Sequence, residues 1–312
     1  MNIIFMTNSE FSFPSLDLLV KSNHNILGVV TNPPQKIGRK KKEFNNAITL
    51  KCEEIGIKAI EQQDINDIGF ENELRKYDFD LFVVVAYRIL PKPLLNIPKL
   101  GSINLHGSLL PAYRGAAPIQ WSLINGDKQT GLSTFLVEPK VDTGAIIKQK
   151  IIKISESENF GLLKDRMAIE GSRLLLDTIN LISDGKISPI EQDENFVSKA
   201  PKITKRMTFI DWNSSSIDIH NFVRGLSPNP GAQSKIYGKN IKIQETKIVD
   251  NNIYKVSFIP GQVVDVSKNK LCIQTGNGIL SIIQLQLEGK RSLDIKPFLN
   301  GYSLKIGDYF GT

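Results

Sequence analysis

Asn104 and His106 are the first residues of the chain whose types and spacing could do chemistry. They open the stretch NLHGSLLPAYRG, residues 104–115, which follows an apolar run. Residues two apart on a β-strand point to the same face, so an amide and an imidazole would line one wall while Leu105 faces the core. Two glycines and a proline in the next nine residues would let a loop wrap around a small ligand.

Asp142, in the stretch EPKVDTGAI, is the carboxylate that could complete this site. We expect strands at residues 133–138 and 145–152, which places Asp142 at their junction, where it could face His106. Such a trio, without a Ser or Cys in an activating motif, suits acyl transfer from a donor directly to an amine. Asn104 and His106 would stabilise the oxyanion, and Asp142 would orient the imidazole and relay protons. Spacing alone also leaves a structural role open for the Asn-x-His pair.

The first half of the chain alternates short apolar segments with segments of helical spacing. The expected strands are residues 2–7, 25–32, 58–62 and 80–87, and the expected helices are residues 15–23, 47–56 and 70–78. This alternation predicts an α/β domain with a doubly wound, Rossmann-like, mostly parallel sheet that binds ligands at the carboxyl ends of its strands. The turn after the first strand contains no glycine, and no GxxxxGK[ST] motif occurs, which disfavours a dinucleotide or ATP site.

The second half of the chain has a different pattern. A helical repeat spans residues 162–182, a polar and basic stretch without periodicity follows it, and short strands separated by turn pairs fill the remainder. This pattern predicts a small C-terminal β-barrel of the OB-like kind. We therefore expect a catalytic domain at residues 1–188, a linker at 189–208 and the barrel at 209–312.

Basic residues are concentrated in the last third of the chain. Residues 1–195 contain 23 Lys and Arg against 24 Asp and Glu, whereas residues 196–312 contain 16 against 8. A basic appendage on a near-neutral body is typical of a protein that binds a polyanion, although surface lysines that favour solubility give the same count. A loop in the first half adds four consecutive cations that could contact phosphates: Arg39, Lys40, Lys41 and Lys42.

The composition excludes several classes of protein. A hydrophobic content of 41% and a charged content of 23% are ordinary for a globular protein, and the longest apolar run is too short to cross a bilayer. Two cysteines far apart in the sequence predict neither a disulfide framework nor a zinc ribbon, and three scattered histidines predict no metal site. We expect a cytoplasmic monomer with no membrane segment.

The run NLHGSLLPAYRGAAPIQWSLINGDKQTG, with VDTGAII downstream, resembles the 10-formyltetrahydrofolate-dependent formyltransferases. The family signature Asn-x-His-x-Ser-Leu-Leu-Pro and its later Asp-Thr-Gly are matched at residues 104–111 and 142–144. The resemblance implies that Asn104, His106 and Asp142 are catalytic and that 10-formyltetrahydrofolate is the formyl donor. It also implies that two loop segments line the folate site: Ser108, Leu109, Leu110 and Pro111, and Arg88, Ile89 and Leu90.

The resemblance extends over nearly the whole chain and is strongest to the members of the family that formylate methionyl-tRNA. Residues 37–46 match the place of the family's basic loop, and residues 199–232 resemble its linker and the start of its C-terminal domain. The implied acceptor is methionyl initiator tRNA, whose methionyl amine would attack the formyl carbon. The implied tRNA-binding residues are Arg39, Lys40, Lys41, Lys42, Lys202, Lys205, Arg206 and Arg224.

Three segments depart from the family pattern. VVAYRILP, residues 84–91, is one residue shorter than usual and has Arg88 where glycine is common, which changes the expected shape of the pterin pocket. Lys140 and Val141 stand where glycine and leucine are frequent, and the opening turn lacks the family's Gly-Thr-Pro. Arg114, just past the signature, could bind a phosphate or support the loop.

Two other functions stay open on the sequence alone. A formyltransferase that acts on an amino-sugar nucleotide would share the catalytic trio and the donor, but it would give no reason for the basic loop and the basic second half. A non-catalytic RNA-binding protein with a degenerate transferase fold would have no need of Asp142. We therefore expect direct formyl transfer to methionyl initiator tRNA, for translation initiation.

Overall fold

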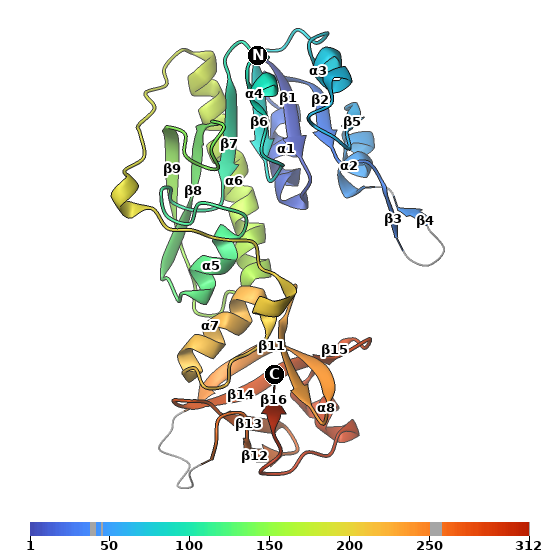
Figure 1. Cartoon of the computed structure of the whole chain (residues 1–312), viewed down its shortest axis with the longest axis vertical. Coiled ribbons are helices and arrows are strands. Elements are labelled where there is room, and N and C mark those ends of the chain that lie inside the picture. Colours follow the sequence, from blue (N-terminus) through green and yellow to red (C-terminus); the bar gives the residue numbers. More distant parts are fainter. Residues whose placement is uncertain (38–41, 45, 250–257, 312) are drawn as a thin grey trace. The chain divides into compact units, whose positions relative to one another are not determined.

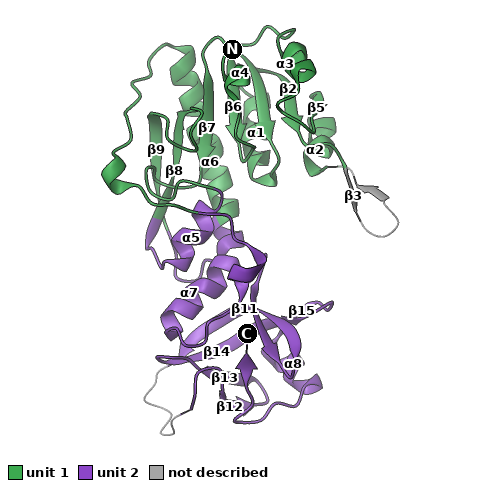
Figure 2. Ribbon diagram, viewed as in Figure 1, with its two compact units in different colours: residues 1–115, 130–153, 164–200 green, residues 116–129, 154–163, 201–312 purple. Residues whose placement is uncertain are grey.

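The computed structural model describes residues 1–37, 42–44, 46–249 and 258–311, which form two compact units. Figure 1 shows the elements along the chain, and Figure 2 shows the two units. Unit 1 consists of Met1–Gly115, Thr130–Lys153 and Lys164–Ala200, and unit 2 of Ala116–Gln129, Ile154–Leu163 and Pro201–Thr312. Two short stretches before residue 188 thus pack with the C-terminal part, and the domain boundaries at 188 and 209 stay predictions.

Unit 1 is built on a seven-stranded sheet in the order β5-β2-β1-β6-β7-β8-β9. The strands from β5 to β7 pair in parallel, and β8 pairs antiparallel with β7. The order reverses between β1 and β6, so the carboxyl ends of the central strands form the edge at which ligands bind in such sheets. The strands are β1 (Asn2–Thr7), β2 (Asn25–Thr31), β5 (Ala59–Glu61), β6 (Leu81–Val85), β7 (Ser102–His106), β8 (Gln129–Leu136) and β9 (Ile146–Lys153).

The central strands are covered on both faces by helices. Every residue of β6 is buried, as a continuous apolar run in a parallel sheet predicts. On one face Ile4 and Met6 of β1 pack with Phe70 and Leu94, which lie on helices that cover this face. The helices and the 3₁₀-helices of this part are η1 (Glu10–Ser12), α1 (Phe13–Val20), α2 (Ala47–Ile55), α3 (Ile68–Leu74), α4 (Lys92–Leu95), α6 (Phe160–Ser183) and η2 (Glu194–Phe196).

Helix α6 packs on the sheet at a glycine. A Cβ on Gly171 would lie 2.9 Å from Leu105 Cδ2, so the missing side chain lets the helix approach β7 closely. Leu105 therefore faces α6, and the residues on either side of it in β7 face away from that helix. Helix α2 ends as expected at Gly56, which has a φ of 71°.

Unit 2 is a curled antiparallel sheet in the order β12-β13-β14-β11-β10-β16, with β15 paired to β14. The two edges of this sheet are joined by an antiparallel bridge between Gln262 and Tyr309, so the sheet nearly closes on itself. The predicted α/β fold with a small C-terminal β-barrel is confirmed. The strands are β10 (Ala232–Ile236), β11 (Lys239–Val249), β12 (Val263–Ser267), β13 (Lys270–Gln274), β14 (Ile279–Leu287), β15 (Ser292–Asp294) and β16 (Phe310–Gly311).

Helices of unit 2 pack on the barrel and on each other. Ile219 and Val223 of one helix join the barrel core with Ile243 and Leu280, and Gly225 lets the same helix approach Ile124. The helices and the 3₁₀-helix are α5 (Pro118–Ile124), η3 (Lys205–Thr208), α7 (Ser216–Leu226) and α8 (Ile295–Gly301). Across the described residues, we find no helix with both the length and the apolarity needed to cross a bilayer.

Most elements expected from the first half are present, with ends displaced by a few residues. A short hairpin, β3 (Gln35–Ile37) and β4 (Lys42–Phe44), was not predicted because strands of three residues are too short to show a period.

Candidate active site

Asn104 and His106 lie at the carboxyl end of β7, in the middle of the unit 1 sheet. Asn104 is paired with Val84 of β6 and Phe135 of β8, and His106 is paired with Ser133. Because they are two residues apart on a strand, their side chains lie on the same face, as the sequence predicts. This face is the one opposite to Leu105 and helix α6.

The His106 ring is oriented by a hydrogen bond to a backbone carbonyl group. Its Nε2 lies 2.9 Å from the carbonyl oxygen of Tyr113. A carbonyl can only accept a hydrogen bond, so Nε2 carries the hydrogen, and Nδ1 is the nitrogen that can take up a further proton. Phe135 packs edge-on against the ring, with centroids 6.4 Å apart, and only 7% of the His106 side chain is exposed.

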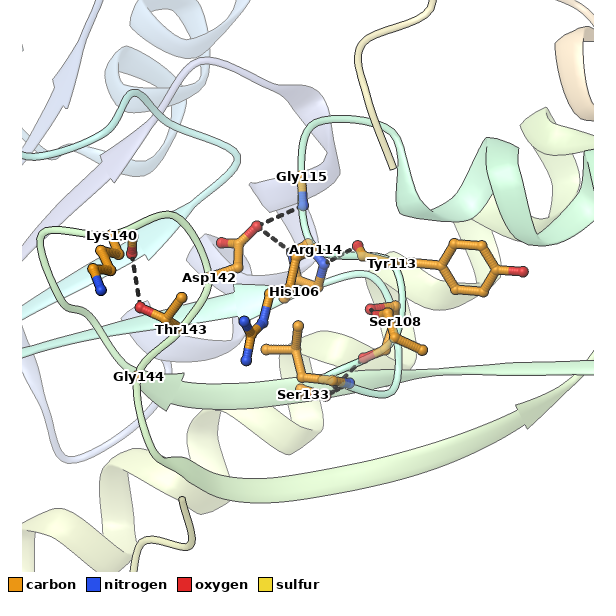
Figure 3. A network of polar contacts seen from close by, with 12 residues as sticks. His106, Ser108, Tyr113, Arg114, Gly115, Ser133, Lys140, Asp142, Thr143 and Gly144 are labelled. Atoms are coloured by element: carbon orange, nitrogen blue, oxygen red, sulfur yellow. Dashed lines mark hydrogen bonds and ion pairs between the residues drawn. The ribbon is translucent and has the colours of Figure 1, made fainter. Parts of the chain in front are cut away.

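Asp142 faces this free nitrogen. Its Oδ2 lies 3.7 Å from His106 Nδ1 and accepts a hydrogen bond of 2.8 Å from the Gly115 amide, as Figure 3 shows. The Asp142 side chain is only 12% exposed, so the imidazole and the Gly115 N–H replace most of the water around the carboxylate. The structure thus brings together His106 and Asp142, which the sequence predicts to face each other.

The loop that carries Asp142 joins β8 to β9 and has an unusual backbone. Asp142 has a φ of 53°, in the left-handed region that non-glycine residues seldom adopt. A Cβ on Gly144 would lie 1.7 Å from the carbonyl oxygen of Leu136, so no side chain fits there. The Thr143 hydroxyl donates to the Lys140 carbonyl and closes the turn. The shape of this loop thus depends on Asp142, Thr143 and Gly144. The side chains of Lys140 and Val141, which depart from the family pattern, take no part in these contacts.

Asn104 has a side-chain oxygen that no described residue satisfies. Its Oδ1 is buried and has no hydrogen-bond partner among the described residues. A buried amide oxygen without a partner is costly, and such atoms mark places where a ligand or water completes the hydrogen bonding. The buried oxygen of Asn104 therefore marks a point on the predicted wall where a water or a ligand would supply the missing hydrogen bond.

The loop after His106 is held from within by hydroxyl groups. The Ser108 hydroxyl donates to the Ala112 carbonyl (2.6 Å), and the Ser133 hydroxyl donates to the Ser108 carbonyl (2.7 Å) while accepting from the Leu110 amide (3.0 Å). Gln149 donates to both Ser133 Oγ and the Leu110 carbonyl, each at 2.8 Å. This network stabilises the conformation of the loop whose Gly115 amide donates a hydrogen bond to Asp142.

Two family models cover most of the chain. Residues 1–179 match the model described as formyl transferase, and residues 202–303 match the model of the formyl transferase C-terminal domain. The chain belongs to the formyl transferase family.

Named relatives in the family match the chain from end to end. A methionyl-tRNA formyltransferase of Agathobacter rectalis is 35% identical over 311 residues, which cover 99% of each chain. One of Alkaliphilus oremlandii is 37% identical over 312 residues, which cover 100% of each chain. The sequence expectation of a formyltransferase is therefore confirmed at the level of the family.

Solved structures share the fold at much lower identity. The sugar 3N-formyl transferase WlaRD matches with a TM-score of 0.65 and 19% identity, over 93% of this chain and 99% of its own. HypX from Aquifex aeolicus matches with a TM-score of 0.65 and 16% identity, over 99% of this chain and 53% of its own. At these identities the likeness shows the fold alone.

The residues that the resemblance places at the folate site differ in exposure. Ser108 and Leu110 are buried, Leu109 and Pro111 are half-buried, and a Cβ on Gly131 would meet the Leu109 side chain. Ile89 is 63% exposed, whereas Leu90 belongs to the core. Their contact with folate stays a prediction.

Arg88 does not project freely from the end of β6. Its guanidinium donates to the carbonyl oxygens of Gln63 (2.6 Å) and Gln62 (2.5 Å) and to the side-chain oxygen of Asn32. It therefore ties the shortened segment after β6 to residues that follow β2 and β5. The neighbouring Tyr87 hydroxyl is buried and makes no hydrogen bond of good geometry within the described parts of the chain, although Arg88 lies 5.4 Å from the centre of its ring. Burial raises the pKa of Tyr87 against the opposing effect of the Arg88 charge.

The basic residues predicted to bind tRNA are dispersed over both units. Arg39, Lys40 and Lys41 lie outside the described residues, and Lys42 begins β4. Lys202, Lys205 and Arg206 are exposed, on and before η3 in unit 2. Contact of these residues with tRNA stays a prediction.

Arg224 is the exception among these residues, because its guanidinium is engaged within unit 2. It donates to Asn221 Oδ1 (2.9 Å) and to the carbonyls of Ser155 and Glu158 (3.3 Å each). Burial lowers the pKa of Arg224, because it removes water from the cation. The carbonyl oxygens of Ser155 and Glu158 replace part of this water as hydrogen-bond acceptors. Within the structure Arg224 fastens the segment before α6 to α7, and its contact with tRNA stays a prediction.

Sequence reasoning missed several residues that build the site. Tyr113 and Gly115 act through backbone atoms, and Gln149 acts through a hydrogen bond that no motif encodes. Gln192 lies in the segment predicted as a linker, where no periodicity points to it. Arg114 donates to Gln192 and Glu194, so its two alternatives resolve in favour of loop support.

Proposed function

We propose that the protein transfers a formyl group from 10-formyltetrahydrofolate to the amino group of methionyl initiator tRNA. The single observation that carries the proposal is the meeting of Asp142 with His106, on the strand whose Asn104 has a buried side-chain oxygen without a partner among the described residues. The full-length relatives named methionyl-tRNA formyltransferase support the choice of acceptor. The enzyme is thus a transferase of one-carbon groups that acts in translation initiation.

The site residues fit a formyl donor bound at the ends of β6 and β7. Asn104 Oδ1 and the Tyr87 hydroxyl are buried polar atoms that lack hydrogen-bond partners within the described residues; Asn104 lies on β7, and Tyr87 follows β6. Ile89, two residues after Tyr87, has an exposed apolar side chain. Polar groups that await partners next to an apolar surface suit a planar heterocycle such as a pterin.

Asn104 stabilises the charge that develops on the formyl oxygen by hydrogen bonding, and His106 does so through its positive charge once Nδ1 has taken up a proton. As the methionyl amine bonds to the formyl carbon, negative charge moves to the carbonyl oxygen, and the side-chain amide of Asn104, on the same face of β7 as His106, supplies the N–H that donates to it. The bond between the formyl carbon and the donor nitrogen then breaks. No covalent intermediate with the protein is needed, because the acceptor is itself a nucleophile.

His106 and Asp142 handle the proton that the amine loses. Since Nε2–H is committed to the Tyr113 carbonyl, the proton moves to Nδ1, where Asp142 Oδ2 lies 3.7 Å away. The resulting imidazolium and carboxylate stabilise each other in a site with little exposure to water. The same proton then passes to the leaving nitrogen of the donor, so the protein ends the cycle in its starting state.

The basic residues supply a reason for an RNA acceptor. Cations at Lys202, Lys205 and Arg206 are exposed, and the loop of residues 39–42 adds four more charges. Contacts of this kind position a phosphate backbone without reading its sequence. An amino-sugar nucleotide would use few of them.

The direct test is formyl transfer by the whole protein with three acceptors in parallel: methionyl initiator tRNA, deacylated initiator tRNA and a uridine-diphosphate amino sugar. We expect product with methionyl-tRNA alone. Transfer only to the sugar would replace the proposed acceptor, and transfer to none would refute the activity. A His106→Ala variant should keep its affinity for tRNA while losing the reaction, which separates catalysis from mere RNA binding.

A further inference from the structure

Gln192 lies beside the active site and belongs to the last segment of unit 1, which the sequence predicts to be part of a linker. It follows α6 and precedes η2, and it is 9% exposed. Its Nε2 donates to two carbonyl oxygens of the catalytic loop, those of Asp142 (2.9 Å) and Gly144 (2.8 Å). Its Oε1 accepts from Arg114 Nε at 3.0 Å. A single buried amide thus uses both of its donor hydrogens and its oxygen on residues next to the site.

These contacts close a ring of hydrogen bonds around the carboxylate. The Gln192 side chain donates to the Asp142 carbonyl, and the Asp142 carboxylate accepts from the Gly115 amide. Gly115 follows Arg114 in the chain, and Arg114 donates to Gln192, which completes the ring. Breaking any one of the three hydrogen bonds opens the ring. The ring fixes the carboxylate relative to the loop that also orients His106 through Tyr113.

The backbone of Asp142 needs such support. Its left-handed φ of 53° is unfavourable for a residue with a Cβ, so the loop would relax if its carbonyl groups were free. Gln192 holds the carbonyls of Asp142 and Gly144 together, on the two sides of Thr143. A small relaxation of this loop would displace the carboxylate from His106.

The segment around Gln192 is itself held against unit 1 on both sides. Ile190 exchanges two backbone hydrogen bonds with Ile146, each of 2.8 Å. The Ser198 hydroxyl accepts from the Tyr113 amide (2.8 Å), and the Ser198 carbonyl accepts from the Arg114 amide (2.9 Å). Gln192 is therefore placed by its neighbours and does not depend on the catalytic loop for its own position.

We propose that Gln192 is a positioning residue for formyl transfer: its side-chain amide holds Asp142 in the conformation in which the carboxylate faces His106. The inference rests on the proposed function for its effect on rate, whereas the hold on the loop is a property of the chain alone. Gln192 touches neither reacting group, so it acts through Asp142. The segment between α6 and unit 2 is in this way a structural part of the active site.

The test compares Gln192→Met with Gln244→Met. Methionine keeps the length of the side chain and removes its hydrogen-bonding groups. Gln244 is a matched control, because it is 7% exposed and its Oε1 accepts from the Ser227 hydroxyl (3.2 Å) in unit 2. We expect Gln192→Met to lower kcat about 10- to 100-fold with KM for both substrates within about threefold, since misplacement by about an ångström costs rate rather than binding. Gln244→Met should leave kcat near that of the wild type.

A second measurement, hydrogen–deuterium exchange, does not require activity. Exchange in residues 138–145 should become faster in Gln192→Met than in the wild type and stay unchanged in Gln244→Met. If the wild type forms no formylated product, the proposed function fails, and the exchange rates still decide whether Gln192 holds the loop. Unchanged exchange in this loop, or equal kcat in the two variants of an active enzyme, would overturn the proposal.

A double-mutant cycle separates positioning from a general structural role. If Gln192 acts through Asp142, adding Gln192→Met to Asp142→Asn should cost much less rate than it does in the wild type. Single turnovers at high enzyme concentration make the slow variants measurable. Equal costs in both backgrounds would show that Gln192 contributes by another route and would contradict the proposal.

Discussion

His106 Nδ1 and Asp142 Oδ2 lie 3.7 Å apart, and each of the two groups is oriented by a backbone atom of the same short turn. The Tyr113 carbonyl holds the imidazole at 2.9 Å, and the Gly115 amide holds the carboxylate at 2.8 Å. The pair is therefore set by the loop between β7 and α5 rather than by direct contact. Because the buried carboxylate faces the imidazole nitrogen that can take up a proton, a proton bound at His106 Nδ1 is stabilised by the charge of Asp142.

Asp142→Asn should abolish most of the activity while leaving the fold intact. The substitution keeps an oxygen for the Gly115 amide and removes the negative charge that stabilises protonated His106, so we expect kcat to fall about 10²- to 10⁴-fold. Single-turnover formylation measures the loss, and circular dichroism checks the fold. Asp177→Asn, at an exposed aspartate that pairs with Lys148, is the control and should stay active. Wild-type rates in Asp142→Asn would remove the carboxylate from the mechanism.

The rate of formyl transfer should fall at acid pH. The attacking amine must be neutral, and an α-amino group titrates near about pH 8, so its reactive fraction declines steadily below that value. Single-turnover rates at saturating substrates between about pH 5 and 8 measure this decline. A rate independent of pH over that range would contradict the requirement for a neutral amine.

Gly144→Ala should impair the enzyme through the backbone. The added Cβ would lie 1.7 Å from the Leu136 carbonyl oxygen, so the loop that carries Asp142 must shift. We expect a loss of about 1–3 kcal/mol in the free energy of unfolding, as for other overpacked sites, together with a lower kcat. Gly301→Ala is a matched control, because a Cβ there meets no atom within 4 Å. Similar kcat in the two variants would show that the loop tolerates the shift.

The fold could be predicted from the sequence because its signals are local. The apolar run of β6 and the glycine that ends α2 each act over a few residues, and the structure places both as expected. The Asn-x-His pair is local too, since the strand period alone puts both side chains on one face. The strand junction at Asp142 indicates only that the carboxylate could face His106, because a turn between two strands can point in many directions; the resemblance adds the catalytic role.

The rest of the site depends on contacts between distant segments. Gln192 and Ser198 reach the turn at Arg114 from a stretch without periodicity, so nothing in their neighbourhood marks them. Arg88 replaces a residue that the family commonly has, and its three acceptors come from the ends of other strands. Such hydrogen bonds form only between segments that the order of the strands brings together. That order cannot be read from local patterns in a single sequence.

Reversing the charges of Lys40, Lys41 and Lys42 to Glu should weaken tRNA binding. Each phosphate contact that is lost reduces the dependence of log K on log salt by about 0.7–0.9, so both affinity and salt dependence should fall. Folate binding should stay the same. Reversing three exposed lysines of unit 1, Lys76, Lys92 and Lys186, is the control for net charge. Equal effects of the two triple variants would show that the loop contributes only general charge.

The lowered pKa of His220 predicts that the folded protein loses stability against unfolding at acid pH, through a group in unit 2. Its ring is partly buried on α7, its Nδ1 lies 2.9 Å from the Thr246 hydroxyl, and burial with the nearby Arg224 charge lowers its pKa below 6.5. The unfolded chain therefore binds a proton at a higher pH than the folded chain does. The contribution of His220 to stability is complete above about pH 6.5 and is lost as the pH falls toward the lowered value.

His220→Asn removes this titration. Thermal unfolding of the wild type should shift to lower temperature between pH 7.5 and 5.5 by more than that of the variant, because the variant has no proton to take up at this position. Parallel slopes for wild type and His220→Asn would show that the imidazole has the same proton affinity in both states, because only a difference between folded and unfolded chain makes stability depend on pH.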